Sequence, residues 1–268
     1  MHLLIVISAV SAALLVRLMW TISRADWNTR WRRTLGAFLF PPLVLVASAI
    51  SILWMGPSGR MVHWWDGWES YSLAIGFLIG AIALGIQLTI DAQNSLKQVR
   101  QLPQVLVQNT PVRLLATSTP FIAQVGFWNP ELVISQGLLA TLDEEHLAVA
   151  IAHEQAHHHY RDTFWFFCLG WLRRLTRWLP NTETLWQELM ILRELRADRW
   201  AAQRVDGLVL AEALLSVVSA SQAEAPWAAA LNDAVIQNRL SERIDALLEE
   251  SEPLSELGWT NWIWLTVA

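Results

Sequence analysis

The sequence predicts a mainly α-helical protein in which N-terminal transmembrane helices precede an α+β domain with a small antiparallel sheet. Three observations support this fold class. Of the 268 residues, 54% are hydrophobic, which is high for a soluble domain of this length. Apolar stretches near the N-terminus are long enough to cross a bilayer. Short runs rich in β-branched residues then precede a long helical region.

The predicted membrane domain covers residues 1–94. Its expected spans are at about residues 3–20, 35–55 and 71–90, and each approaches the roughly 20 apolar residues that a transmembrane helix needs. The first span has neither a basic segment before it nor a small-residue cleavage site after it, so we expect an anchor and not a signal peptide. The second contains Pro41 and Pro42 near its start, where we expect a late helix start or a kink.

Charges between the spans set the expected orientation. The loop between the first two spans carries Arg24, Arg30, Arg32 and Arg33 against one acidic residue, Asp26. By the positive-inside rule this loop is cytoplasmic, so the N-terminus lies outside and the chain after the third span lies in the cytoplasm. The net charge of -5, without a basic face interleaved with aromatic side chains, argues against nucleic acid as a partner. The expected partners are the lipid bilayer and a substrate.

A second domain is expected over residues 95–250, and it begins with a small antiparallel sheet. The strands are predicted at Val105–Gln108, Val112–Ala116, Phe121–Val125 and Leu132–Ser135. Asn129 and Pro130, between the last two strands, are typical of a hairpin turn.

Helices are predicted from Thr141 nearly to the end of the chain, with breaks at Pro180-Asn181 and around Ala225-Pro226. Thr141 and Glu144 match the capping box S/T-x-x-E, which indicates a helix start at Thr141.

Two Trp-containing stretches outside the spans are also apolar. We expect residues 164–179 to lie at the membrane surface, with a re-entrant or fourth spanning segment as the alternative, and residues 251–268 to form an interfacial tail. The single cysteine, Cys168, permits neither an internal disulfide nor a Cys-based zinc site. His2 and His63 are isolated in the sequence and are interpreted as interfacial side chains.

The segment from His153 to His157 has the pattern HExxH. On a helix this spacing places two imidazoles one turn apart on the same face, where they can bind one Zn²⁺ ion. Glu154 lies beside them and can take a proton from a water molecule at the metal without being a ligand, so we expect it to be the catalytic base. The alternative is a chance match on a His-rich surface helix, since His158 and His159 follow directly.

A second motif supplies the missing ligand. Glu194, on a later predicted helix, is the expected third metal ligand, and Asp198 can accept the free ring N–H of a ligating histidine. Two histidines and one glutamate leave a fourth position open for water, as catalytic zinc sites do. The alternative is a solvated helix face on which both carboxylates pair with Arg193, Arg196 or Arg199. Because HExxH is present, we favour the ligand interpretation.

Together these motifs resemble those of gluzincin membrane peptidases. The matching residues are His153–His157, Arg161-Asp162 and Arg193–Asp198, and they are supported by Gly126–Pro130 and by Arg239–Leu248. The closer resemblance is to the BlaR/MecR-type antirepressor peptidase family, and the HtpX and CAAX prenyl endopeptidase family is its near relative. The resemblance covers about residues 95–250.

The resemblance implies a zincin-like catalytic domain in a multi-pass protein of the bacterial inner membrane. The implied activity is zinc-dependent cleavage of a protein substrate at the cytoplasmic face, such as a transcriptional repressor. The alternatives are a quality-control protease of the HtpX type and a non-catalytic, zinc-binding scaffold. The segment Trp178–Asn181 departs from the Phe-Asn-Pro of the family, and the chain stops at Ala268 without a penicillin-binding domain, so β-lactam sensing is not expected.

Two further expectations concern catalysis. An extended substrate is expected to add to the strand at Phe121–Val125. His146, His158 and Arg161 are candidates for stabilising the oxyanion, on proximity in the sequence alone.

Overall fold

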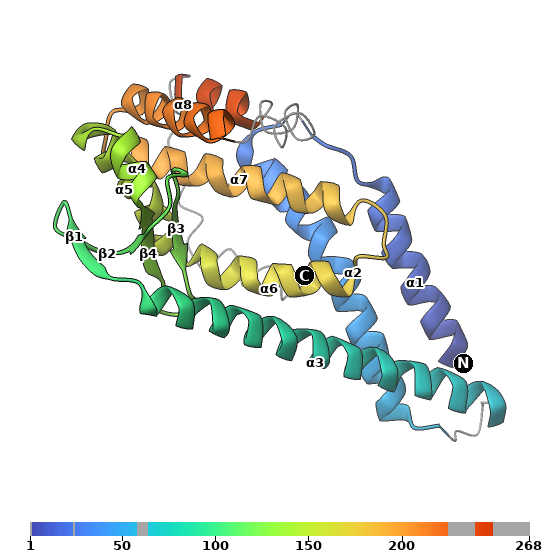
Figure 1. Ribbon diagram of the computed structural model, residues 1–268. Helices are drawn as coiled ribbons and strands as arrows, with labels where there is room; N and C mark the ends of the chain where they lie inside the picture. Colours follow the sequence, from blue (N-terminus) through green and yellow to red (C-terminus); the bar gives the residue numbers. More distant parts are fainter. Residues whose placement is uncertain (1, 24, 58–63, 225–238, 249–268) are drawn as a thin grey trace.

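The computed structural model describes residues 2–23, 25–57, 64–224 and 239–248 (Figure 1). In chain order the elements are α1 (His2–Met19), α2 (Trp27–Met55), α3 (Trp64–Gln101), β1 (Gln104–Val107), β2 (Thr110–Leu115), β3 (Ile122–Val125), β4 (Glu131–Ser135), α4 (Gln136–Thr141), α5 (Glu144–His159), α6 (Asp162–Leu175), α7 (Thr182–Ala202) and α8 (Gly207–Glu224). Residues 239–248 are also helical. The break expected at Ala225-Pro226, the tail at 251–268 and His63 lie outside the described residues.

Helices α1, α2 and α3 are each long and apolar enough to cross a membrane. This confirms the three predicted helices, although α2 begins earlier than expected, at Trp27, and α3 continues to Gln101. Of the late start or kink expected for the second helix, the late start is wrong, because the Asp26 carboxylate caps the helix by accepting from the Thr29 N–H at 3.1 Å. The helix then continues past Pro41 and Pro42.

A buried arginine compensates for one of these prolines. Pro42 lacks the N–H that would bond to the carbonyl of Phe38. Arg17 of α1, which is fully buried, donates to that carbonyl at 3.3 Å and to the Thr176 hydroxyl at 3.4 Å. The Asn181 side chain in turn donates to the backbone carbonyl of Arg17 at 2.8 Å. The turn between α6 and α7 is thereby fastened to both α1 and α2.

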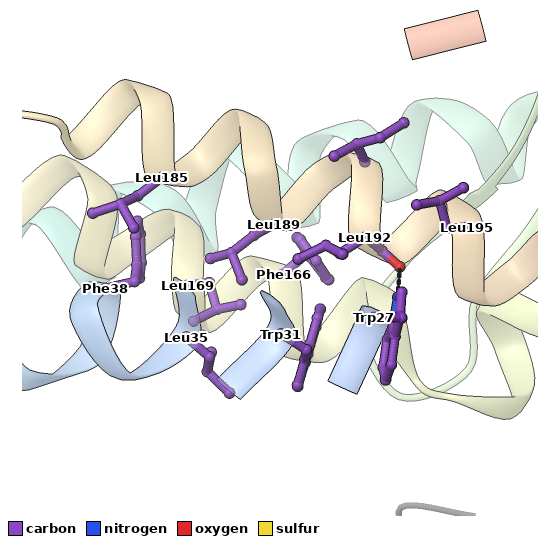
Figure 2. Close-up of a cluster of buried hydrophobic side chains, with 11 residues drawn as sticks. Trp27, Trp31, Leu35, Phe38, Phe166, Leu169, Leu185, Leu189, Leu192 and Leu195 are labelled. Carbon is purple, nitrogen blue, oxygen red and sulfur yellow. Dashed lines mark hydrogen bonds between the residues drawn. The ribbon is translucent and has the colours of Figure 1, made fainter. Parts of the chain in front are cut away.

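The main helical core lies between α2, α6 and α7, and Figure 2 shows how their side chains face one another. Its buried members are Trp27, Trp31, Leu35, Phe38, Phe166, Leu169, Leu185, Leu189, Ile191, Leu192 and Leu195. Burial of each such leucine contributes about 2 kcal/mol. The indole N–H of Trp27 also donates to the Leu192 carbonyl at 2.9 Å. Helix α7 is therefore fixed along α2.

Helix α6 packs against protein on several sides. It lies between α3 and α7 (Figure 1). The Trp171 indole donates to the Ala81 carbonyl of α3 at 2.8 Å. Its ring packs against Gly85, where the absence of a side chain leaves room for it. The interpretation of residues 164–179 as a helix lying at the membrane surface missed these contacts, because an apolar helix face carries no information about whether lipid or another helix covers it.

The four strands form one sheet in the order β1-β2-β4-β3. The pairs β1–β2 and β3–β4 are antiparallel, but β2 and β4 are parallel, so the sheet is mixed and the prediction of an antiparallel sheet is wrong. The reason lies in β4, where Leu132, Val133 and Ile134 are all buried. Such a continuous apolar run is typical of a strand in the interior of a sheet. After β2 the chain therefore forms the edge strand β3 first, and it then returns through a hairpin so that β4 lies between β2 and β3.

A glutamate joins the sheet to the end of α3. The Glu131 carboxylate of β4 accepts from Arg100 of α3 at 2.8 Å and from Arg113 of β2 at 2.6 Å. Burial alone would raise the pKa of Glu131, but the hydrogen bonds from the two arginines outweigh it and lower the pKa. The sheet is thus held in place directly after α3.

Candidate metal centre

Helix α5 carries the HExxH segment and is covered on two sides. Leu147 and Ile151 pack toward the sheet, whereas Val149 and Ala152 pack toward α8. His153 and His157 are only 8% and 7% exposed. The alternative of a His-rich surface helix therefore fails for these two histidines, although His158 and His159 are exposed.

The start of α5 differs from the predicted capping box. The N-cap is Asp143, whose carboxylate accepts from the His146 N–H at 2.9 Å. Thr141 is the last residue of α4, and its hydroxyl donates to the Gly137 carbonyl at 2.8 Å. The S/T-x-x-E pattern was misleading because an aspartate two positions later competes for the same role and caps at least as well as threonine.

Three side-chain atoms from two helices converge at the centre of the site. Nε2 of His153 lies 3.2 Å from Nε2 of His157 and 3.2 Å from Oε2 of Glu194. Nε2 of His157 lies 3.7 Å from the same Glu194 oxygen. Zinc bonds of about 2.0–2.1 Å in a tetrahedron require ligand atoms roughly 3.3 Å apart. The three atoms therefore have nearly the spacing of one face of a zinc tetrahedron, and they could hold a metal ion.

Each histidine has a carboxylate at its other ring nitrogen. Nδ1 of His153 lies 2.8 Å from Oδ1 of Asp198, a close ion-pair contact without the alignment of a regular hydrogen bond. Nδ1 of His157 makes a hydrogen bond of 2.8 Å with Oδ2 of Asp162. Such carboxylates fix the ring orientation and direct Nε2 toward a metal. The structure brings Asp198 to the expected place, and it adds Asp162, to which the sequence analysis assigned no role.

Asp162 reaches His157 because the chain turns sharply after α5. Arg161, between the two residues, adopts a left-handed conformation with φ of 53°. Few non-glycine residues do so. The signal was present in the sequence as the Arg161-Asp162 pair after HExxH, but the spacing alone does not reveal that the chain folds back onto the preceding helix.

Arginines surround the carboxylates of the site. Arg243, from the helix at 239–248, forms two bonds of 2.7 Å with Asp198 and lies 3.6 Å from Oε2 of Glu194. Arg193 binds the other Glu194 oxygen at 2.6 and 2.9 Å. Arg196 pairs with Asp162. The alternative of arginine pairing is thus correct for Glu194, which pairs with Arg193, but Asp198 pairs with Arg243 instead of one of the arginines named there. These pairs are largely buried and form part of the site instead of a solvated face.

These charges act in opposite ways on the proposed ligands, since they keep Glu194 ionised, as a cation needs, and favour a proton on His153, which a cation would have to displace. Burial would raise the pKa of Glu194, yet hydrogen bonds from His153 and His157, with the charges of Arg193 and Arg243, hold it well below its usual value. Burial would lower the pKa of His153, but Asp198 and Glu194 outweigh it and raise the pKa to about 9. In the metal-free protein a proton on the imidazole thus balances the carboxylates, and a divalent cation would take over that role.

Glu154 lies next to the ligands with a largely free carboxylate. Its side chain is buried, with 7% of the residue exposed. In the part of the chain that the structure describes, no side chain donates a hydrogen bond to it, and Arg243 is close enough to attract it electrostatically. A carboxylate in this position can accept a proton from water.

The three oxyanion candidates have other surroundings. His146 contacts Asp143 at 2.7 Å and Glu212 of α8 at 3.5 Å, one with each ring nitrogen. His158 and Arg161 are exposed. Within the described ranges, no side-chain contact joins any of the three to the metal-ligand cluster.

No protein-family model matches this sequence, and the search of curated proteins found no match. The fold and the cluster together define a mainly helical protein with three helices long and apolar enough to span a membrane and a His-His-Glu group, its histidines buried, that could hold a metal ion. Its function has to be argued from its own residues.

Proposed function

We propose that the protein is a membrane-anchored zinc metalloendopeptidase with a zincin-like catalytic domain. One observation carries the proposal: Nε2 of His153, Nε2 of His157 and Oε2 of Glu194 converge at 3.2 to 3.7 Å. Glu154 follows His153 on α5, is buried, and accepts no hydrogen bond from a side chain in the part of the chain that the structure describes. Two histidines and one glutamate leave a fourth position open, which is the donor set of catalytic and not of structural zinc. The resemblance of the motifs to gluzincins of the BlaR/MecR type points the same way.

The proposed chemistry divides between the metal and the chain. Zinc, when bound, supplies a Lewis acid that polarises the scissile carbonyl and makes water acidic enough to lose a proton near neutral pH. Glu154 receives that proton and delivers it to the leaving amine. Asp198 and Asp162 keep His153 and His157 oriented, so that the ligand atoms need not rearrange during the reaction.

The sheet offers a place for an extended substrate. β3 is the last strand in the order β1-β2-β4-β3, so one of its edges has no partner among the described strands. β3 also packs next to α5, which carries the HExxH residues. A peptide paired with this edge would run past the metal site, in the manner of other peptides that add to a sheet edge. The substrate-binding role expected for Phe121–Val125 therefore remains our proposal.

The membrane helices suggest where the enzyme acts. Helix α7, which bears Glu194, is bound to the beginning of α2 through the Trp27–Leu192 hydrogen bond. The proposed site therefore lies close to the end of α2 that bears Arg30, Arg32 and Arg33. Because positive charge marks the cytoplasmic side, we propose cleavage at the cytoplasmic face of a bacterial inner membrane. A membrane-associated protein or a transcriptional repressor would be within reach.

The test compares wild type with Glu154→Gln, which removes the base and keeps the ligands. We expect both proteins, purified in detergent, to hold about one zinc per chain. Mass spectrometry of cells producing each form should then find new protein N-termini only with wild type. Glu145→Gln, on the exposed start of the same helix, is the matched control and should cleave like wild type. If wild type binds zinc but produces no cleavage that is lost in Glu154→Gln, the protein is not an endopeptidase, and the non-catalytic zinc-binding scaffold is the better proposal.

A further inference from the structure

The helix at 239–248 lies over the metal centre although it is distant in the sequence. Its Arg243 is bidentate to Asp198 at 2.7 Å and lies 3.6 Å from Oε2 of Glu194. One guanidinium thus contacts both the carboxylate that orients His153 and the carboxylate that is the third ligand. The Arg243 side chain is 15% exposed and the Asp198 side chain 1%, so the pair is shielded from water. Charge-assisted bidentate pairs of this kind fix geometry strongly.

The same helix is tied to the membrane domain by the preceding residue. Glu242 accepts from Nη1 of Arg30 at 2.5 Å, and Arg30 belongs to the first turns of α2. Arg30 also binds Glu188 of α7, at 2.9 Å through Nε and 2.8 Å through Nη2. Arg30 therefore contacts both elements that build the site: the helix that carries Arg243, and α7, which carries Glu194.

The burial of these charges makes the contacts consequential. The side chains of Arg30 and Glu188 are 16% and 9% exposed, and that of Glu242 is 37% exposed. Loss of one member of a largely buried pair leaves the other charge without compensation, which costs much more than loss of an exposed pair. A change at Arg30 should therefore leave the buried Glu188 without compensation and shift α7, and it should also release the 239–248 helix from its contact with α2 through Glu242.

We propose that Arg243 is a positioning residue of the metal centre. We propose further that Arg30, near the start of α2, fixes the position of the 239–248 helix relative to α7, and so the position of Arg243 relative to Glu194. The inference rests on the proposed function, in that it assumes a metal at His153, His157 and Glu194. It adds that the metal affinity of the site depends on where the end of a membrane helix lies. Arg243 acts through Asp198 and Glu194, and no contact with the substrate is required of it.

The experiment measures zinc affinity of the full-length protein in detergent by competition with a chelator, and the absorption spectrum of the cobalt-substituted protein. Arg243→Lys keeps the positive charge but cannot form the bidentate pair with Asp198. It should weaken zinc binding about 10- to 100-fold, as other changes beside metal ligands do. Arg30→Gln should weaken it about 2- to 30-fold, the range for residues coupled to a site without touching the ligand. Both should change the cobalt spectrum, which reports ligand geometry and not general stability.

Arg173→Gln is the matched control, because Arg173 pairs with Glu183 at 2.6 Å in an exposed ion pair on α6 and α7. It should leave affinity and spectrum unchanged. Wild-type zinc affinity and an unaltered cobalt spectrum in both Arg243→Lys and Arg30→Gln would overturn the inference and leave the proposed function standing. If wild type itself binds neither metal, the proposed function fails and the inference fails with it.

Discussion

Replacing Asp162 should weaken metal binding without touching any proposed ligand. Its Oδ2 holds Nδ1 of His157 at 2.8 Å, while Oδ1 pairs with Arg196. Asp162→Asn keeps an oxygen that can accept from His157 but removes the negative charge. Asp162→Ala removes both and leaves Arg196, whose side chain is 14% exposed, without its carboxylate. The two variants therefore separate the contribution of the charge from that of the contact.

The magnitude follows from the role of such carboxylates. Loss of a group that orients a ligating histidine costs about 10- to 100-fold in metal affinity, or about 1.4 to 2.7 kcal/mol. We expect Asp162→Asn at the lower end and Asp162→Ala at the upper end. The alanine variant should also unfold more readily without metal, by about 3 kcal/mol, because a largely buried arginine loses its partner. The asparagine variant is therefore the principal test.

Zinc affinity is measured by chelator competition, and the unfolding midpoint of the metal-free protein is recorded for each variant. Asp91→Asn is the control, because the side-chain contact of Asp91 among the described residues is an exposed one, 3.9 Å from Arg174 of α6. If Asp162→Asn and Asp162→Ala both bind zinc as tightly as wild type, Asp162 does not orient a metal ligand, and the assignment of His157 as a ligand loses its main structural support.

Three predictions concern stability. The pKa of Glu131 is lowered in the folded state, so its ion pairs stabilise the protein above pH ~4.3 and are lost as the pH falls through the lowered pKa. Glu131→Gln should therefore show less loss of helical circular dichroism between pH 5 and 3 than wild type, and an equal loss would contradict this. Gly137→Ala would place a Cβ 1.6 Å from the Ser118 carbonyl oxygen, so it should lower the unfolding free energy by about 3 kcal/mol, whereas Gly36→Ala, with open space around it, should be neutral or slightly stabilising. Leu189→Ala should cost about 2–5 kcal/mol in thermal unfolding, because Leu189 is fully buried between α2, α6 and α7, and a cost below 1 kcal/mol would show that this core is loose.

The membrane helices were predictable because their signal is local. A stretch such as residues 35–55 is apolar at nearly every position and carries no charge, and no partner is needed to recognise it. The ends of the helices were less predictable, since Trp27 is helical only because Asp26 caps the chain before it. The continuation through Pro42 depends on Arg17, which lies on another helix. Sequence periodicity cannot reveal such compensation.

The strands were predicted nearly residue by residue, but their order was not. Alternation and β-branched residues mark a strand, whereas the neighbour of a strand is decided by which apolar runs must be buried on both faces. Leu132, Val133 and Ile134 carried that information, because their continuous apolar run is typical of a central strand. Interpreted in that way, β4 would have been placed in the interior, and the parallel pair with β2 would have followed.

Some residues of the metal-ligand cluster could likewise be predicted from the local sequence, whereas others depend on contacts between distant segments. His153 and His157 are one helical turn apart, so their common face follows from the sequence. The convergence of Glu194 with them depends on how α7 packs, and a motif could only suggest it. Asp162 required an unusual backbone conformation at Arg161. Arg243 required the docking of a helix from the far end of the chain.

The two contributions that come from distant helices, Glu194 and Arg243, have one feature in common, which is that both depend on contacts with α2. Helix α7 is fixed by Trp27 and Arg30 of α2, and its preceding turn is fixed by Arg17 of α1. A soluble metal site with the same ligands would be held by its own core alone. Here the third ligand lies on a helix whose position is set by helices suited to a bilayer, so extraction into a detergent that loosens α1 from α2 should weaken metal binding before it unfolds α5.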